Sequence, residues 1–183
     1  MTGIGTNTTG AFIPRLMDLM EDIFCIDTAR EYATGLSNGG MMSYQMGVSL
    51  SKRLAAIAPT AATFPHGFIQ TPEVPVALLH LHGLADTEIP PQKVVSRLGW
   101  KWSLTQDVVN AWADANECED IRNGRAEDRR FENDITRRLP FHDLNCEFIG
   151  DCKNGDVLYC LWNGQHMYLG TKLFAFPCCI RYL

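Results

Sequence analysis

The chain has 183 residues, of which 46% are hydrophobic and 20% are charged, and its formal net charge is −5. This length suits one domain with a substantial core and is too short for two ordinary domains. The negative charge disfavours a nucleic-acid partner, and no segment approaches the roughly 20 apolar residues that span a membrane. Residues 1–7 lack the basic and apolar regions of a signal peptide.

Hydrophobic spacing predicts helices that alternate with short apolar strands. In chain order we expect a helix over 11–24, a strand over 31–36, a helix over 40–50, strands over 54–59 and 76–81, a helix over 103–117 and a strand over 157–162. Ser103 and Gln106 are spaced for a capping box at the third helix. Short apolar strands between helices are typical of a parallel sheet with helices on both faces. The fold class expected is therefore α/β.

One region departs from this alternation, and the number of cysteines is also unusual. Residues 119–147 are dense in Arg, Glu and Asp, so we expect a charged, solvated insertion there. Seven cysteines are many for a cytosolic protein, and disulfides, zinc ligation and buried thiols are the alternatives for them. The absence of a C-x-x-C pair around the clustered cysteines disfavours zinc. The seven cysteines of the chain are Cys25, Cys118, Cys146, Cys152, Cys160, Cys178 and Cys179.

The most specific motif is the G-x-S-x-G pentapeptide over residues 35–39. It stands between the strand over 31–36 and the helix over 40–50. A serine on such a strand-to-helix turn has its hydroxyl pushed out of the sheet, and the glycines supply room for the turn. Ser37 is therefore a candidate nucleophile.

Two partners for Ser37 follow later strands. Asp86 comes after the strand over 76–81, and His166 comes after the strand over 157–162. A serine nucleophile needs a base to take its proton and an acid to orient that base. The carboxyl ends of parallel strands meet at one edge, and the order Ser, Asp, His is that of α/β-hydrolases.

Each candidate has a plainer alternative: Ser37 as a helix N-cap, Asp86 as a turn residue and His166 as a loop histidine. Glu88 is the nearest rival acid, and His142 is the competing base. His82 is expected to serve the turn geometry. Core packing is expected for three tryptophans that could otherwise line a sugar or acyl pocket, namely Trp100, Trp102 and Trp162.

Three segments together carry a family resemblance: residues 32–42 (YATGLSNGGMM), 82–90 (HGLADTEIP) and 162–167 (WNGQHM). They resemble the polyhydroxybutyrate depolymerase and feruloyl esterase group, which are secreted α/β-hydrolase esterases of carbohydrate-esterase type. The resemblance spans about residues 10–170. It implies an extracellular enzyme that needs no metal or organic cofactor.

The resemblance also implies a role for particular residues. Ser37 would be the nucleophile, His166 the general base and then acid, and Asp86 its orienting carboxylate. The backbone N–H of Asn38 would supply half of the oxyanion hole. A disulfide common in the family corresponds here to Cys118 with Cys152.

The chain departs from the family at both ends. In the family the elbow follows the fifth strand, whereas one helix precedes it here, so about four strands and the second oxyanion donor are absent. We therefore expect residues 1–183 to form a single, N-terminally truncated α/β-hydrolase domain. The strand before Ser37 would then be a bare sheet edge that promotes self-association. Residues 173–183 resemble nothing expected in the family.

The function expected is a serine carboxylic-ester hydrolase that forms an acyl-enzyme. Its substrate would be a feruloyl, acetyl-xylan or hydroxyalkanoate ester, linked to a polysaccharide or within a polyester. One alternative is a non-catalytic fragment or pseudoenzyme that keeps the triad residues without a complete oxyanion hole. Another is a small metal-binding module that uses the clustered cysteines.

Overall fold

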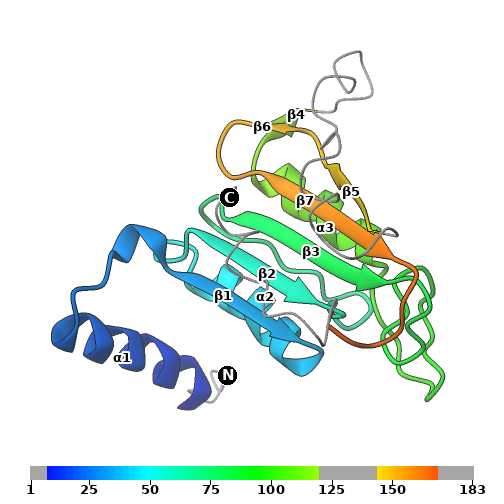
Figure 1. Ribbon diagram of the computed structural model, residues 1–183, viewed down its shortest axis with the longest axis horizontal. Helices are drawn as coiled ribbons and strands as arrows, with labels where there is room; N and C mark the ends of the chain where they lie inside the picture. The colour runs from blue at the N-terminus through cyan, green and yellow to red at the C-terminus, as the bar shows by residue number, and fades with distance from the viewer. Residues whose placement is uncertain (1–7, 120–143, 169–183) are drawn as a thin grey trace, which may run out of the picture.

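The computed structural model describes residues 8–119 and 144–168 (Figure 1). The helices are α1 (Thr8–Ile23), α2 (Asn38–Ser49) and α3 (Thr105–Ala115), with a 3-10 turn, η1, at Thr28–Arg30. The strands are β1 (Tyr32–Leu36), β2 (Ala56–Thr60), β3 (Ala77–Gly83), β4 (Cys118–Glu119), β5 (Asn145–Phe148), β6 (Asp151–Cys152) and β7 (Val157–Trp162).

The main sheet is mostly parallel. Its strand order is β1-β2-β3-β7-β5, and β4 pairs with β6 in a separate two-stranded sheet. The pairings from β1 to β7 are parallel, whereas β5 runs antiparallel to β7. Figure 1 shows the parallel strands pointing the same way, so their carboxyl ends share one edge of the sheet. The expected α/β class is confirmed, and each expected helix and strand is present.

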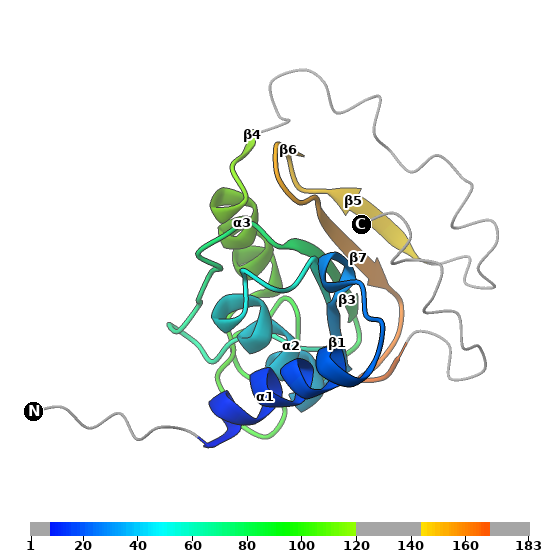
Figure 2. The same cartoon turned by 90° about the vertical axis from the view of Figure 1, so that its left-hand side faces the viewer.

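Helices α2 and α3 lie on the same face of the sheet (Figure 2). Successive residues of a strand point to opposite sides of the sheet. Because the buried strands consist mainly of consecutive apolar residues, both of their faces are apolar. The cluster under the helices includes Tyr44, Ile57, Leu78, Val108, Val109, Trp112 and Val157. A second cluster contains Ala58, Leu79, Leu81, Cys160 and Trp162. The expectation of helices on both faces is not met by α2 and α3, which both cover the first cluster.

The start of α3 corrects one expectation. The helix begins at Thr105 after an N-cap at Leu104, so the capping box at Ser103 was wrong. The hydroxyl of Ser103 donates instead to the carbonyl of Pro65, and the Gln106 amide donates to Asn110. Long-range contacts with the loop before β3 outweigh the local capping preference.

Strand β5 corrects the boundaries of the charged insertion. Residues 145–147 of this strand were assigned to the insertion over 119–147, whereas residues 120–143 lie outside the described part of the chain. The polar residues of β5 alternate with half-buried Cys146 and Phe148, which is the pattern of an edge strand. That alternation covers four residues only, which is too short to stand out in a charged sequence.

Helix α1 lies beyond β1 at one end of the sheet (Figures 1 and 2). Arg53, which precedes β2, forms ion pairs with Asp18 and Glu21 of this helix. The apolar residues that predicted the helix are nevertheless exposed: Phe12, Leu16, Leu19, Met20 and Ile23. None of the described helices is long and apolar enough to cross a bilayer.

Candidate active site

Ser37 lies at the sharp turn between β1 and α2. Its backbone has φ 57° and ψ −121°, a left-handed conformation that residues with a side chain rarely adopt. The backbone N–H donates to the carbonyl of Thr60 at 3.0 Å, which ties the turn to the end of β2. Ser37 occupies the N-cap position of α2, but its hydroxyl makes no capping hydrogen bond. The N-cap alternative therefore does not account for this side chain.

Close backbone contacts explain the glycines of the turn. A Cβ on Gly35 would overlap the backbone of Gly39, and a Cβ on Gly40 would lie 2.6 Å from the Cβ of Ala62. A Cβ on Gly39 itself would meet nothing within 4 Å. Gly35 and Gly40 thus let the chain double back tightly around Ser37.

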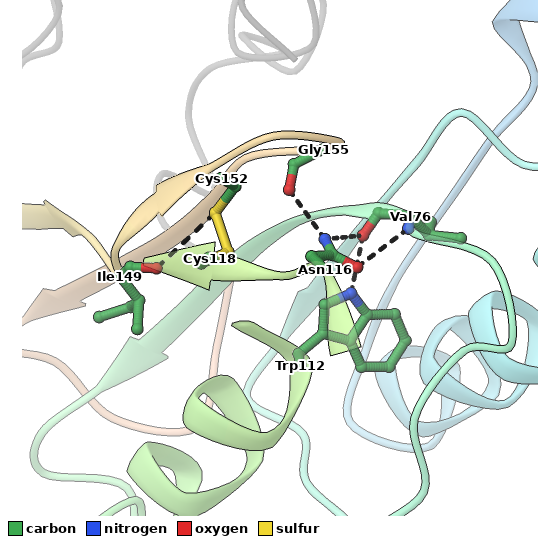
Figure 3. The surroundings of a disulfide bond; sticks show 7 residues. All are labelled: Val76, Trp112, Asn116, Cys118, Ile149, Cys152 and Gly155. Carbon is green, nitrogen blue, oxygen red and sulfur yellow. Dashed lines mark hydrogen bonds between the residues drawn. A yellow bond between two sulfur atoms is a disulfide. The ribbon is translucent and has the colours of Figure 1, made fainter. Parts of the chain in front are cut away.

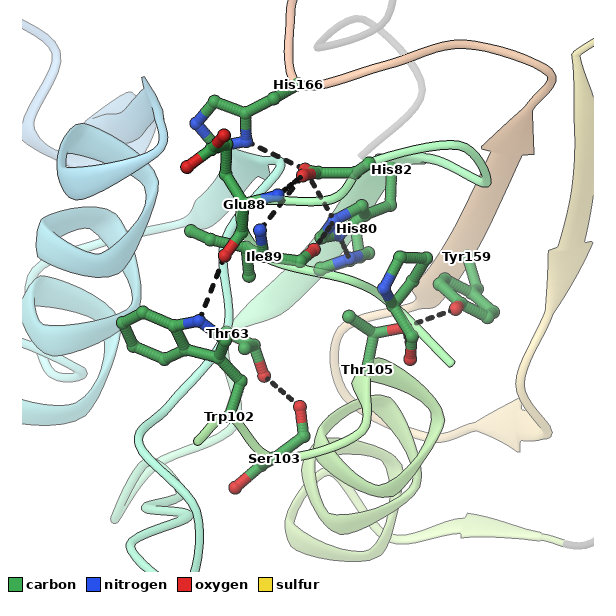
Figure 4. Close-up of polar contacts among 12 residues, drawn as sticks. Thr63, His80, His82, Glu88, Ile89, Trp102, Ser103, Thr105, Tyr159 and His166 are labelled. Carbon is green, nitrogen blue, oxygen red and sulfur yellow. Dashed lines mark hydrogen bonds and ion pairs between the residues drawn. The ribbon is translucent and has the colours of Figure 1, made fainter. Parts of the chain in front are cut away.

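Asp86 lies on the turn that follows β3 and is only 3% exposed. Its Oδ1 accepts the backbone N–H groups of Glu88 and Ile89, at 2.8 and 2.9 Å. Its Oδ2 accepts a hydrogen bond from His166 Nδ1 at 2.7 Å (Figure 4). Burial acts to raise the pKa of Asp86, but hydrogen bonds from His82, His166 and the Ile89 backbone outweigh it, so the pKa is lowered.

His166 reaches Asp86 because backbone hydrogen bonds join the loops after β3 and β7. The backbone N–H of Leu84 donates to Trp162, and that of Ala85 donates to Gly164, each at 2.8 Å. A Cβ on Gly83 would overlap the Gly164 carbonyl, so the approach requires glycine there. Because the carboxylate can only accept, His166 Nδ1 carries a hydrogen, and in the neutral imidazole Nε2 then has the free lone pair. This arrangement suits a general base.

The structure brings two of the three expected residues into direct contact. Ser37, Asp86 and His166 each follow a parallel strand at the same edge of the sheet, and Asp86 and His166 are hydrogen-bonded. Across residues 8–119 and 144–168, no hydrogen bond joins the Ser37 side chain to His166. Asn38 is the first residue of α2, and the first N–H groups of a helix have no partner within it.

The rival acid Glu88 has a different partner. The Glu88 carboxylate forms an ion pair with Arg97 at 2.7 Å. His142 lies outside the described residues. Trp162 is buried as expected, but Trp100 is 64% exposed, so core packing was wrong for that residue. Trp102 donates its indole N–H to the Glu88 carbonyl at 3.1 Å, beside the Asp86 turn (Figure 4).

Sequence reasoning missed a further contact of Asp86, with His82. His82 Nε2 lies 3.2 Å from the same Oδ2 that accepts from His166. His82 had been assigned to the turn geometry alone. The spacing His80-x-His82 in a buried strand was the available signal, since residues two apart in a strand share a face.

Among the cysteines in the described part of the chain, Cys25 is free and exposed, and the other four form two disulfides. Cys118 pairs with Cys152 and joins β4 to β6, as the family resemblance implied (Figure 3). Cys146 pairs with Cys160 and joins β5 to β7, which the sequence did not indicate. Within residues 8–119 and 144–168, no group of three His, Cys, Asp or Glu side chains could hold a metal ion. Cys178 and Cys179 lie outside the described residues.

A buried asparagine, Asn116, forms hydrogen bonds near the first disulfide (Figure 3). The Asn116 amide donates to the carbonyls of Val76 and Gly155, at 2.9 and 2.8 Å, and accepts the Val76 backbone N–H at 3.2 Å. Trp112 donates its indole N–H to the same Val76 carbonyl at 2.7 Å. These bonds join the end of α3 to the starts of β3 and β7, the two strands that lead to Asp86 and His166.

Comparison with known proteins gives matches to esterases, and no family model matches the chain. A probable feruloyl esterase C of Aspergillus niger and feruloyl esterase C of Emericella nidulans are each 34% identical over 87 residues. These matches cover 46% of this chain and 32% of each relative. A bifunctional acetylxylan esterase/xylanase of Neocallimastix patriciarum is 32% identical over 90 residues, 49% of this chain and 13% of the relative. The chain thus matches only about a third of the length of the feruloyl esterases to which it is similar.

Proposed function

We propose that the chain is a serine carboxylic-ester hydrolase whose catalytic groups are Ser37, His166 and Asp86. The observation that carries this proposal is the 2.7 Å hydrogen bond between His166 Nδ1 and Asp86 Oδ2, at the ends of two adjacent parallel strands. The left-handed backbone at Ser37 and the similarity to esterases support it.

In the proposed reaction, Ser37 Oγ attacks the ester carbonyl while His166 Nε2 takes the hydroxyl proton. The backbone N–H of Asn38 donates to the developing oxyanion, and Asp86 stabilises the imidazolium. His166 then gives its proton to the leaving alcohol, which leaves an acyl group on Ser37. Water, deprotonated by His166, attacks the acyl-enzyme and releases the carboxylic acid.

The proposed substrates follow the relatives and the family resemblance. The relatives' names specify feruloyl and acetylxylan esters, so we propose feruloyl or acetyl esters carried by polysaccharide, with hydroxyalkanoate esters as a further class. The two disulfides support an extracellular location for the protein.

We further propose that a second copy of the chain packs against the free side of β1. Among the described residues β1 is the last strand at one end of the main sheet, helix α1 lies beyond it (Figures 1 and 2), and several apolar side chains of α1 are exposed. An edge strand offers unpaired N–H and C=O groups, and a second apolar surface would cover the helix.

Labelling with a fluorophosphonate tests the catalytic proposal directly. The reagent phosphonylates an activated serine, and mass spectrometry locates the adduct. We expect an adduct on Ser37 in the folded wild-type protein, and none in Ser37→Ala or His166→Ala. Ser43→Ala is the matched control, because Ser43 lies in α2 and donates to the Gly39 carbonyl at 2.9 Å, away from the proposed role. A folded wild-type protein without an adduct would support the non-catalytic alternative.

A further inference from the structure

A line of buried polar side chains ends at Asp86. The Tyr44 hydroxyl lies 2.6 Å from His80 Nδ1, and His80 Nε2 lies 3.1 Å from His82 Nδ1. His82 Nε2 then lies 2.8 Å from the Ile89 carbonyl and 3.2 Å from Asp86 Oδ2. Tyr44, His80 and His82 are each 0% exposed. Buried polar groups are costly unless paired, and every ring nitrogen of this line has a partner.

The acceptors at one end fix the hydrogens along the line. The Ile89 carbonyl and the Asp86 carboxylate can only accept, so His82 Nε2 carries a hydrogen. A neutral His82 therefore accepts at Nδ1 from His80 Nε2, and His80 accepts at Nδ1 from the Tyr44 hydroxyl. Burial, and then the neighbouring His82, hold the pKa of His80 well below its ordinary value, so His80 is neutral. All three hydrogens point toward Asp86.

Ring packing holds this line rigidly. The His80 and His82 rings stack with centroids 5.3 Å apart, and Tyr159 packs on His80 at 5.4 Å. Tyr44 packs edge-on against Trp112 at 5.5 Å. Figure 4 shows His80, His82 and Tyr159 side by side beneath His166. Tyr44 belongs to α2, the helix that begins directly after Ser37, so the line connects the helix of the nucleophile to the acid.

The line matters for Asp86 because two imidazoles share one oxygen. Oδ1 is already occupied by two backbone N–H groups, whereas Oδ2 accepts from His166 and is approached by His82. A donor on the inner side of Oδ2 limits rotation of the carboxylate and leaves its outer lone pair facing His166.

We propose that His82 is a positioning residue for Asp86, and that Tyr44 and His80 hold His82 in the tautomer that donates to this carboxylate. The proposal rests on the proposed catalytic function of Asp86 and His166, and it adds a role for residues that do not touch substrate. A purely structural line would stabilise the core without affecting the Asp86–His166 hydrogen bond.

Nitrogen-15 and proton NMR of the folded protein tests the proposal without any substrate. We expect His80 and His82 to be neutral with hydrogen on Nε2, and His166 Nδ1–H to give a far-downfield proton signal. Tyr44→Phe should shift or broaden the His166 signal. Tyr159→Phe is the matched control, because its hydroxyl bonds Thr105 outside the line while its ring packs on His80. Hydrogen on His82 Nδ1, or equal His166 signals in the two variants, would overturn the proposal.

Kinetics on an ester that wild-type protein hydrolyses gives the second readout. We expect His82→Leu to lower kcat about 10–100-fold with KM unchanged, the equivalent of one hydrogen bond to a charged group. His82→Gln keeps an N–H donor and should recover most of that loss. Equal losses in the two variants, or a loss confined to KM, would contradict the proposal. An inactive wild-type protein with the expected NMR signals would instead count against the proposed function alone.

Discussion

At the scale of single residues, Asp86 and Glu88 can be separated by substitution. Asp86→Asn removes the negative charge beside His166 and replaces an acceptor with a group that also donates. We expect kcat to fall about 10⁴-fold, the loss seen when the acid of a serine triad becomes an amide. Glu88→Gln is the control, since its carboxylate pairs with Arg97 at the surface. Steady-state hydrolysis of a feruloyl or acetyl ester measures both, and equal losses would make Glu88 the acid.

The candidate site shows what single-residue reasoning can find. Ser37, Asp86 and His166 were predicted because each directly follows an apolar strand, and the structure pairs Asp86 with His166. His82 was missed because a histidine next to a glycine turn has a sufficient local explanation. Its contact with Asp86 depends on the turn after β3 folding back over the strand, which no spacing in the sequence specifies.

At the scale of elements, the glycines of the Ser37 turn are predicted to differ in importance. Gly35→Ala places a Cβ into the backbone of Gly39, so we expect the turn to shift and labelling of Ser37 to be lost. Gly39→Ala meets open space at the start of α2 and should retain folding and labelling. Thermal unfolding and fluorophosphonate labelling of the two variants check this difference. A labelled, stable Gly35→Ala protein would contradict it.

The predictions of helices and strands were correct where the apolar runs were long enough to be recognised in the sequence. Strands β2 and β3 are buried along their whole length, and their runs stood out in the sequence. Strand β5 and the first residue of α3 were not predicted correctly, because contacts with residues distant in sequence determine them. β5 gains its place by pairing with β7 and by the Cys146–Cys160 disulfide, neither of which is local. The hydrophobic spacing of α1 likewise predicted a helix but could not predict its position at the end of the sheet.

At the scale of the whole molecule, the exposed side of α1 makes a prediction about assembly. A second copy at the β1 edge would bury apolar side chains of α1 that single chains leave in water. We expect light scattering to show a concentration-dependent dimer, which Leu19→Glu with Ile23→Glu weakens. Leu98→Glu changes a leucine that is even more exposed and lies far along the chain, and it should leave the dimer intact. A monomer at all concentrations would contradict the proposal.

The whole fold should also lose stability in acid, because buried His80 resists protonation. Its pKa in the folded protein is far below 6.5, chiefly through burial, whereas the unfolded chain titrates near the ordinary value of about 6.5. Below that pH the unfolded state binds a proton that the folded state does not, so stability is present above pH 6.5 and falls as pH decreases. The lowered pKa of Asp86 has the same sign, but its contribution is lost only below about pH 4.

Urea unfolding between pH 8 and pH 5, with the disulfides intact, measures this dependence. We expect the free energy of unfolding to fall below pH 6.5 with a slope that His80 increases by up to about 1.4 kcal/mol per pH unit. His80→Gln should be less stable at pH 8 but should lack that part of the slope. His66→Gln removes an exposed histidine and should keep it. An unchanged slope in His80→Gln would mean that His80 takes up its proton within the folded core, and the line from Tyr44 to Asp86 would then carry charge.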